Sequence, residues 1–247
     1  MTAMSLFYSK NNTNNKNKFR YEKKYLLDIN SAVILRQRVS HVLEPDNSAP
    51  FGKYRVSSLY FDDIYSSSYN EKLNGVLTRD KYRARYYNGS FDTIRLERKH
   101  KHGENIYKES ALITPSQYQM MCRGEYDFMR AESLPVFNDF YTAFVLKHMH
   151  PVIMIEYNRQ AFMHKVGNVR LTFDTDLTAG APMASNIFSI LPHEYVVLEV
   201  KYDHFLPSYI NGLLTGVPFT QQLPISKFIL GKQALNAKCV VLPKIKE

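Results

Sequence analysis

The chain has 247 residues, of which 45% are hydrophobic and 13% aromatic, so it can bury a full core and is not globally disordered. It contains 32 Lys and Arg residues against 23 Asp and Glu residues, a net charge of +9 that favours an anionic partner such as nucleic acid, a membrane surface, a nucleotide or inorganic phosphate. Cys122 and Cys239 form no metal-ligand or redox motif, and no apolar run approaches the roughly 20 residues that cross a bilayer. We therefore expect a soluble cytoplasmic protein.

Residues 1–18 are rich in Asn and Lys and lack the apolar core of a signal peptide. They are predicted to form a disordered leader. Residues 19–247 contain no domain linker and no low-complexity segment, so we expect them to form one domain.

The first part of this domain alternates between strand and helix patterns. Residues 19–28 are predicted to include a strand, and residues 30–44 have apolar positions at helical spacing. Residues 54–63 are aromatic and β-branched, which favours a strand. Residues 66–76 are predicted to form a turn or a short helix that ends at Asn74-Gly75.

Three cationic strands are predicted next, over residues 77–89, 92–101 and 105–113. Short links between them favour an antiparallel meander. Side chains of a strand alternate between its two faces, so charged residues at two-residue spacing share one face. The residues that share a face in the first two strands are Arg79, Lys81, Arg83 and Arg85, and Arg95, Glu97, Lys99 and Lys101.

The second half returns to strands after a helical region. Residues 115–148 are predicted to form one or two helices with a break at Pro135. Strands are predicted over residues 152–162, 169–176 and 195–203. Helices are predicted over residues 205–216 and 226–237, the latter with Ser226 as its N-cap.

The predicted fold is α+β, with about eight antiparallel strands and peripheral helices. A single basic strand is explained well enough as a solvated sheet face. In a closed barrel, however, one face of every strand would line the lumen, and a lumen of Arg and Lys would repel itself unless it held a polyanion. A few carboxylates among such cations fit ligands of Mg²⁺ or Mn²⁺, which bridge to phosphates. The pattern therefore indicates a phosphate site.

Nine motifs in a fixed order strengthen this interpretation. They are YEKKYLL (21–27), SLYFDD (58–63), YNEKLNG (69–75), KYRARYY (81–87), IRLERK (94–99), EYNRQAF (156–162), VRLTFDTDL (169–177), VLEVKYD (197–203) and ISKFILG (225–231). The ordered set resembles the VTC domain, the polyphosphate polymerase domain of vacuolar transporter chaperone complexes. That family lies within the triphosphate tunnel metalloenzyme, or CYTH-like, superfamily.

The resemblance implies an eight-stranded antiparallel β-barrel, the triphosphate tunnel, with a C-terminal helix. It also implies transfer of the γ-phosphate of ATP onto a growing polyphosphate chain with Mn²⁺ or Mg²⁺. Carried over by position, the catalytic residues would be Lys24, Arg83, Arg85, Lys99, Arg159 and Lys227. The substrate-binding residues would be Lys108, Tyr157, Arg170, Lys201, Ser226 and Arg95, and the metal ligands Glu199, Glu22 and Glu97.

Some of these roles have alternatives. Related hydrolases use an ExExK strand for metal, whereas Arg20 stands at the first of those positions in this chain, so Glu22 could be only a counter-ion of Lys24. Glu97 could pair with an arginine of the neighbouring strand instead of binding metal. Asp174 is expected to hold an arginine and not a metal.

Three functions fit these patterns. A polyphosphate polymerase is the leading hypothesis. The first alternative is a hydrolase of tripolyphosphate or of an organic triphosphate, and the second is a non-catalytic binder of polyphosphate or nucleotide. Inward cations argue against nucleic acid, which binds to outer cationic surfaces. The expected partners are ATP, pyrophosphate and polyphosphate, with a separately encoded membrane protein as an open alternative and the oligomeric state left open.

Overall fold

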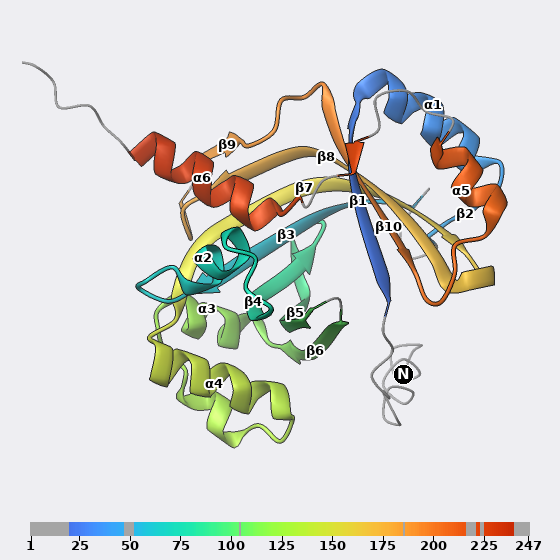
Figure 1. Cartoon of the computed structure of the whole chain (residues 1–247). Coiled ribbons are helices and arrows are strands. Elements are labelled where there is room, and N and C mark those ends of the chain that lie inside the picture. Colours follow the sequence, from blue (N-terminus) through green and yellow to red (C-terminus); the bar gives the residue numbers. More distant parts are fainter. Residues whose placement is uncertain are drawn as a thin grey trace, which may run out of the picture.

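A computed structural model of the protein describes residues 20–46, 52–103, 105–184, 186–215, 221–222 and 225–239. The predicted leader, residues 1–18, lies outside the described residues. A single curled sheet forms the centre of the structure, and helices cover parts of its outer side and its ends (Figure 1). No helix in the described ranges is both long enough and apolar enough to cross a membrane.

All strand pairs of the sheet are antiparallel. The main order is β11-β1-β10-β8-β7-β3-β4-β5-β6, with β2 paired to β7 and β9 to β8. The strands are β1 (Tyr21–Asp28), β2 (Glu44–Pro45), β3 (Lys53–Asp62), β4 (Thr78–Tyr87), β5 (Ser90–His102), β6 (Asn105–Ile113), β7 (His150–His164), β8 (Val169–Gly180), β9 (Ile187–Ser189), β10 (Tyr195–Tyr202) and β11 (Gln221–Gln222). The predicted meander of three cationic strands is confirmed as β4, β5 and β6.

The prediction of a closed eight-stranded barrel is wrong. The described sheet has eleven strands, and its two ends do not pair: β6 pairs only with β5, and β11 only with β1. Register shifts at Tyr60/Phe61, Arg85/Tyr87 and Glu156/Asn158 bend the strands, as bulges do. The sheet therefore curls strongly without joining β6 to β1. The edge of β1 that would face β6 pairs instead with β11, at Tyr25 and Leu26.

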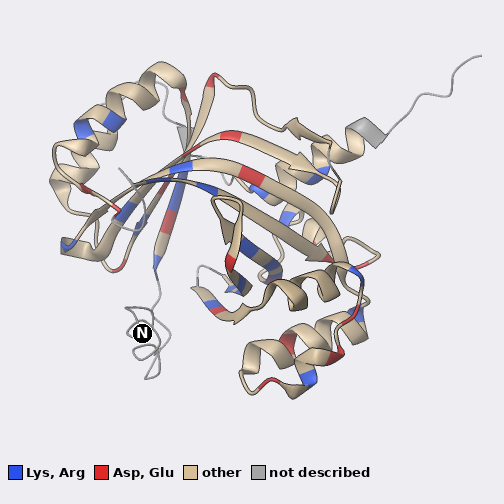
Figure 2. Ribbon diagram, turned by 180° about the vertical axis from the view of Figure 1, so that it is seen from behind, with Lys and Arg blue, Asp and Glu red and all other residues tan. Residues whose placement is uncertain are grey.

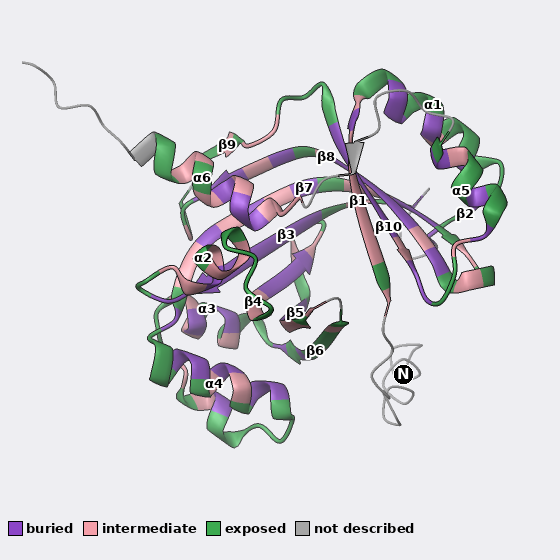
Figure 3. Cartoon of the chain, in the orientation of Figure 1, coloured by how far each residue is buried: buried purple, intermediate pink, exposed green. Residues whose placement is uncertain are grey.

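Alternation along β4 assigns its two faces to different environments. Tyr82, Ala84 and Tyr86 are buried in a hydrophobic cluster that includes residues of α3 and α4. The intervening residues, Arg83 and Arg85, therefore point to the concave side of the sheet. The same alternation on β5 places Ile94 and Leu96 in that cluster. Buried positions accordingly recur along the strands and on the inner faces of the helices (Figure 3).

Six α-helices surround the described sheet. They are α1 (Ile29–Ser40), α2 (Ser67–Leu73), α3 (Pro115–Cys122), α4 (Pro135–Lys147), α5 (Ser208–Thr215) and α6 (Lys227–Cys239), with short 3₁₀ turns at η2 (Asp127–Ala131) and η3 (Val166–Asn168). Pro135 is the first residue of α4. The first backbone N–H groups of a helix have no partner within the helix, so proline loses no hydrogen bond there. The break predicted at Pro135 is thus the start of a helix. The side chain of Asp28 accepts from the backbone N–H of Ser31 at 2.9 Å and caps α1.

Two further clusters position the concave side. One packs α1 and α5 against the outer face of β1, β8 and β10, through Leu35, Phe173 and Ile210. The other packs α6 against β7 and β8, through Phe228 and Ile155. The start of α6 is thereby held at the concave side of the sheet.

Candidate active site

A cavity of about 430 Å³ lies within the curl of the sheet, and we call it the tunnel. Its lining comes from β1, β3 to β8 and β10, together with the start of α6. Lys and Arg positions are spread over many strands of the sheet and are not gathered on one (Figure 2). Among the described residues, eleven cationic side chains line the tunnel against three carboxylates, Glu22, Glu97 and Glu199, so the cavity carries a large excess of positive charge. Such an excess matches a polyanionic ligand.

The structure brings the sequence-predicted residues together with one exception. Those that line the tunnel are Lys24, Arg83, Arg85, Lys99, Arg159, Lys227, Lys108, Tyr157, Arg170, Lys201, Ser226, Glu199, Glu22 and Glu97. Arg95 is exposed and is not among the lining residues, although it is the register partner of Arg85. The roles assigned to these residues remain predictions.

Glu22 and Glu199 lie among lysines where β1 pairs with β10. Lys24 Nζ is 3.0 Å from Glu22 Oε1 and 3.7 Å from Glu199 Oε1, and Lys201 Nζ is 3.3 Å from Glu199 Oε2. Burial and the charge of Glu199 both favour protonation of Glu22, but Lys99, Lys24 and Lys201 outweigh them and lower its pKa to about 2. Burial likewise opposes ionisation of Glu199, yet Lys201 and Lys24 hold the pKa of Glu199 well below its ordinary value. Both carboxylates are therefore ionised at neutral pH.

Glu97 on β5 binds one predicted site residue on each of the two strands beside it, Arg83 on β4 and Lys108 on β6. Arg83 Nε donates to Glu97 Oε2 at 2.7 Å, and Lys108 Nζ donates to Oε1 at 2.8 Å. Burial raises the pKa of Glu97, but Arg83 and Arg85 overcome this and bring it far below its ordinary value. The pairing with Arg83 agrees with the alternative in which Glu97 binds an arginine. Both oxygens of Glu97 are therefore engaged by cations of the tunnel.

Asp174 pairs with two cations of the tunnel lining. Its Oδ1 and Oδ2 accept from Arg159 Nε and Nη2 at 2.7 and 2.8 Å, and Lys227 Nζ lies 2.6 Å from Oδ2. Asp174 is fully buried, so the two cations are fixed in position. The prediction that Asp174 holds an arginine is confirmed.

Two cations of β4 have only neutral partners in the described part of the chain. Arg85 donates to Ser58 Oγ at 2.9 Å and to Tyr157 Oη at 3.2 Å, while Lys81 donates to Ser226 Oγ at 3.0 Å. Neither forms an ion pair with a carboxylate in the described part of the chain. Burial, together with the charges of nearby lysines, lowers the pKa of Lys81 well below its ordinary value. These two residues are therefore the cations of the tunnel that most need an anion.

Sequence reasoning did not assign a ligand-binding role to Lys81, Tyr54 or Tyr60. Lys81 was visible in the two-residue spacing that also contains Arg83 and Arg85. The Tyr60 hydroxyl accepts from Arg83 Nη1 at 3.2 Å, and the Tyr54 hydroxyl accepts from Arg170 Nη2 at 2.9 Å. Burial opposes ionisation of Tyr60, but the neighbouring arginines lower its pKa. The hydroxyls of both tyrosines can donate to an anion in the tunnel.

A second cavity, of about 360 Å³, adjoins the first, and we call it the mouth. It shares Glu22, Lys24, Lys81, Lys99, Ile106 and Ser226 with the tunnel. It adds Lys23, Lys72, Arg79, Lys101 and Ile225. The cationic lining therefore continues beyond the tunnel, and Glu22 is the only carboxylate among the described residues that line the mouth.

Glu22 and Glu199 are the carboxylates best placed to hold a metal ion. No group of three or more His, Cys, Asp or Glu side chains within the described ranges could hold a metal by itself. Two ionised carboxylates beside phosphate-binding cations do fit Mg²⁺ or Mn²⁺, because such ions commonly take one or two carboxylates and complete their coordination with water and substrate phosphates. The residues therefore fit a metal that enters with its substrate.

Comparison with solved structures bears on the fold. A putative adenylyl cyclase from Hippeastrum, described as having a dominant triphosphatase activity, matches with a TM-score of 0.53 and 13% identity, covering 88% of this chain and 96% of its own. A putative adenylate cyclase from Bacillus halodurans matches with a TM-score of 0.48 and 10% identity, covering 85% and 94% of the two chains. At 13% identity the match to the Hippeastrum protein shows a shared fold and nothing more.

Comparison with protein sequences gives the family. No curated protein sequence matches the chain. The family model named VTC domain matches residues 19–236, which include every motif on which the resemblance was based. The chain therefore belongs to the VTC domain family.

Proposed function

We propose that the protein is a metal-dependent polyphosphate polymerase that transfers the γ-phosphate of ATP onto a growing polyphosphate chain inside the tunnel. The observation that carries the proposal is the continuity of the tunnel with the mouth, which share Lys24, Lys81 and Lys99. A triphosphate needs a single cationic cavity, whereas a long polyanion needs a cationic path. Membership of the VTC domain family supports an enzyme that acts on phosphate compounds.

In this proposal the cations of the tunnel bind and orient the reacting phosphates. Among the residues that the structure describes, Arg85 has only neutral partners, and it offers a planar fork to two phosphate oxygens. Arg159 and Lys227 are fixed by Asp174, so they need no reorganisation when charge develops on the transferring group. Ser226 lies at the start of α6, where backbone N–H groups favour an anion, and already accepts from Lys81.

Glu199 and Glu22 are the residues that would hold the metal. When bound, Mn²⁺ or Mg²⁺ would neutralise charge on the phosphate oxygens and act as a Lewis acid. Lys24 and Lys201 contact both carboxylates. They would orient the carboxylate oxygens for the metal and, once the metal is bound, would contact the substrate phosphates instead.

The transfer is a direct displacement. A terminal oxygen of the acceptor chain attacks the γ-phosphorus of ATP, the bond from that phosphorus to the β–γ bridging oxygen breaks, and ADP leaves with the electron pair. The three equatorial oxygens carry the charge of the transition state, and cations of the tunnel lining, Arg83 and Arg159 among them, stabilise it. No covalent intermediate with the protein is required.

Triphosphate hydrolysis is the second candidate function. It is favoured by the fold that this chain shares with the Hippeastrum protein, which is described as having a dominant triphosphatase activity. One observation at β1 argues against it. Arg20, which replaces the first carboxylate of the hydrolase strand motif, binds Asp203 at 3.1 Å and the carbonyl oxygen of Asn168 at 2.7 Å. The hydrolase pair of carboxylates is thus reduced to Glu22 on this strand.

One assay separates these functions. Radiolabelled ATP with Mn²⁺ is incubated with the protein, and products are resolved by chain length. We expect long chains that a polyphosphatase degrades, and we expect Arg83→Ala and Glu199→Ala to abolish them. Release of free phosphate alone, from ATP or from tripolyphosphate, would establish the hydrolase instead, and binding without turnover across several metals would establish a non-catalytic binder.

A further inference from the structure

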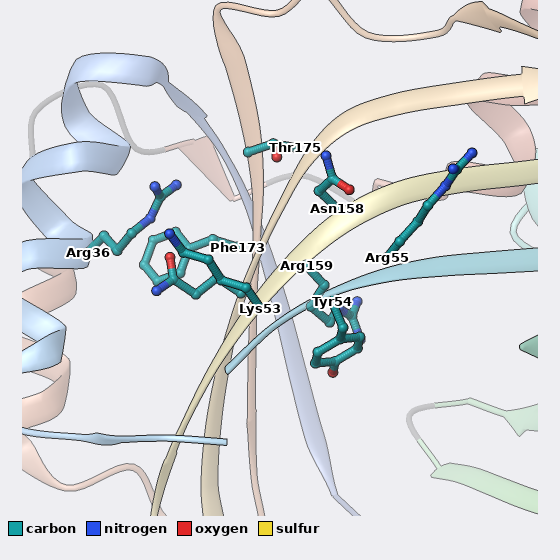
Figure 4. A pocket seen from close by; sticks show the side chains of 9 residues that line it. Arg36, Lys53, Tyr54, Arg55, Asn158, Arg159, Phe173 and Thr175 are labelled. Atoms are coloured by element: carbon teal, nitrogen blue, oxygen red, sulfur yellow. The ribbon is translucent and has the colours of Figure 1, made fainter. Parts of the chain in front are cut away.

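A third cationic cavity lies on the face of the sheet opposite the tunnel. Its volume is about 390 Å³, within the usual range of small-molecule sites. We call it the outer pocket, and it is lined by Arg36, Lys53, Tyr54, Arg55, Asn158, Arg159, Gln160, Phe173 and Thr175. Arg36 approaches from α1, while Tyr54 and Arg159 point through to the other side of the sheet (Figure 4).

The charge of the outer pocket is unbalanced. Its described lining contains no carboxylate. Arg55 is paired with Glu156, but neither Arg36 nor Lys53 forms an ion pair with any described residue. Two positive charges therefore face the outer pocket without a counter-ion among the described residues, which matches a dianion such as a phosphate group better than a single carboxylate.

Arg36 is the better defined of these cations. Its guanidinium carbon lies 5.3 Å from the centre of the Phe173 ring, within the range of a cation–π contact. The Nε atom is buried and has no hydrogen-bond partner within the described ranges. A buried donor without a partner costs free energy, which an anionic acceptor would recover.

Gln160 requires a hydrogen-bond donor from the ligand, whereas Arg36 requires an acceptor. Its Oε1 atom is also buried and has no hydrogen-bond partner among the described residues. A ligand that satisfies both side chains must accept hydrogen bonds at one end and donate one at the other. A phosphate monoester with a hydroxyl or amino group has this chemistry, and so does hydrogen phosphate.

We propose that the outer pocket binds a small phosphate compound. The phosphate group lies between Arg36 and Lys53, and a hydroxyl or amino group donates to Gln160. This site is separate from the proposed chemistry, because the side chains that define it project from the opposite face of β3, β7 and β8.

Calorimetric titration of the whole chain tests the proposal, with AMP, adenosine and orthophosphate as probes. Wild type should show a binding component for AMP that Arg36→Gln weakens at least about tenfold, since a charge-assisted hydrogen bond is lost. Arg38→Gln, on the same helix but outside the lining, should leave it unchanged. Arg85→Gln should also leave it unchanged, which separates it from binding in the tunnel.

A second variant and two further ligands complete the test. Lys53 is exposed, so Lys53→Gln should fold normally and should also weaken the component. Adenosine should not bind, and orthophosphate that binds with the same dependence on Arg36 identifies free phosphate as the source of the ligand. Identical isotherms for wild type, Arg36→Gln and Lys53→Gln, or adenosine binding as tightly as AMP, would overturn the proposal.

Discussion

Lys99 on β5 and Glu22 on β1 form an ion pair, with 3.0 Å between Nζ and Oε2, although their strands are not neighbours in the sheet. β1 lies near one end of the sheet order and β5 near the other. The described strands do not close the tunnel by backbone pairing, so this pair links the two ends of the curl through side chains. It also places Lys99 beside the carboxylates proposed to hold the metal.

The first prediction concerns this link. Glu22→Gln and Lys99→Met should each destabilise the protein, and a double-mutant cycle should give a coupling energy of about 1 kcal/mol, as expected for a partly exposed pair. Urea unfolding at pH 7 measures it. Lys165→Met removes an exposed cation elsewhere and should change the free energy of unfolding by less than about 0.5 kcal/mol. A coupling energy of zero would show that the pair does not hold the sheet together.

The contribution of Glu22 to the free energy of unfolding should also depend on pH. The pKa of Glu22 in the folded protein is about 2, against 4.5 for the free side chain, so its contribution is complete above pH 4.5 and is lost as pH falls through 2. The difference in unfolding free energy between wild type and Glu22→Gln should therefore narrow over this window. A difference that grows on acidification contradicts the assignment.

The second prediction compares two register partners. Arg85 lies buried in the tunnel lining, and its partners within the described ranges are all neutral, whereas Arg95 is exposed and lies outside the lining. Arg85→Gln should lower kcat/KM for ATP by about 100-fold or more, because it removes a donor aimed at the reacting phosphates. Arg95→Gln should change kcat/KM less than about twofold, as for a surface residue away from the reacting groups. A large loss in Arg95→Gln would restore the substrate-binding role predicted from the sequence.

The third prediction concerns the pH dependence of phosphate binding. Burial lowers the pKa of Lys201 to about 8, although Glu199 and Glu22 oppose the shift. The side chain is cationic below pH 8 and loses its proton as pH rises, so the affinity for tripolyphosphate, measured by calorimetry without metal, should fall above pH 8. Lys201→Arg stays charged and should flatten this profile. Identical profiles for both proteins would exclude Lys201 as the titrating group.

The fourth prediction concerns the placement of α6. A Cβ atom at Gly231 would lie 2.9 Å from Ile153 Cδ1 and 3.1 Å from Ile155 Cδ1, so α6 packs closely on β7 there. Gly231→Val should destabilise the protein by about 1–3 kcal/mol through overpacking and should raise KM by shifting Ser226 and Lys227. Gly231→Ala should be milder, because a gain of about 1 kcal/mol in helix propensity offsets the crowding.

A matched glycine provides the control. A Cβ atom added at Gly212 in α5 would have no described atom within 4 Å, so Gly212→Val should be neutral or slightly stabilising and should leave KM unchanged. Thermal unfolding and steady-state kinetics of both variants check the comparison. Equal behaviour of the two valine variants would refute a positioning role for the close contact at Gly231.

The two-residue period of the strands determined much of this protein without tertiary information. It assigned Arg83 and Arg85 to one face and Tyr82 and Ala84 to the other, because successive strand residues point to opposite sides whatever the rest of the chain does. The short links likewise determined the order of β4, β5 and β6. The period could not say how far along a strand the cavity extends, and Arg95 lies beyond it.

Only the tertiary structure decided which charges meet and where the sheet ends. Lys227 reaches Asp174 from the start of α6. Lys99 reaches Glu22, whereas Lys81 has no carboxylate partner within the described ranges, although both lysines stand in the same two-residue pattern on neighbouring strands. Such contacts join residues far apart in the chain, and they depend on strand register, bulges and the packing of α6. The curl that follows leaves β6 unpaired with β1, which no local pattern specifies.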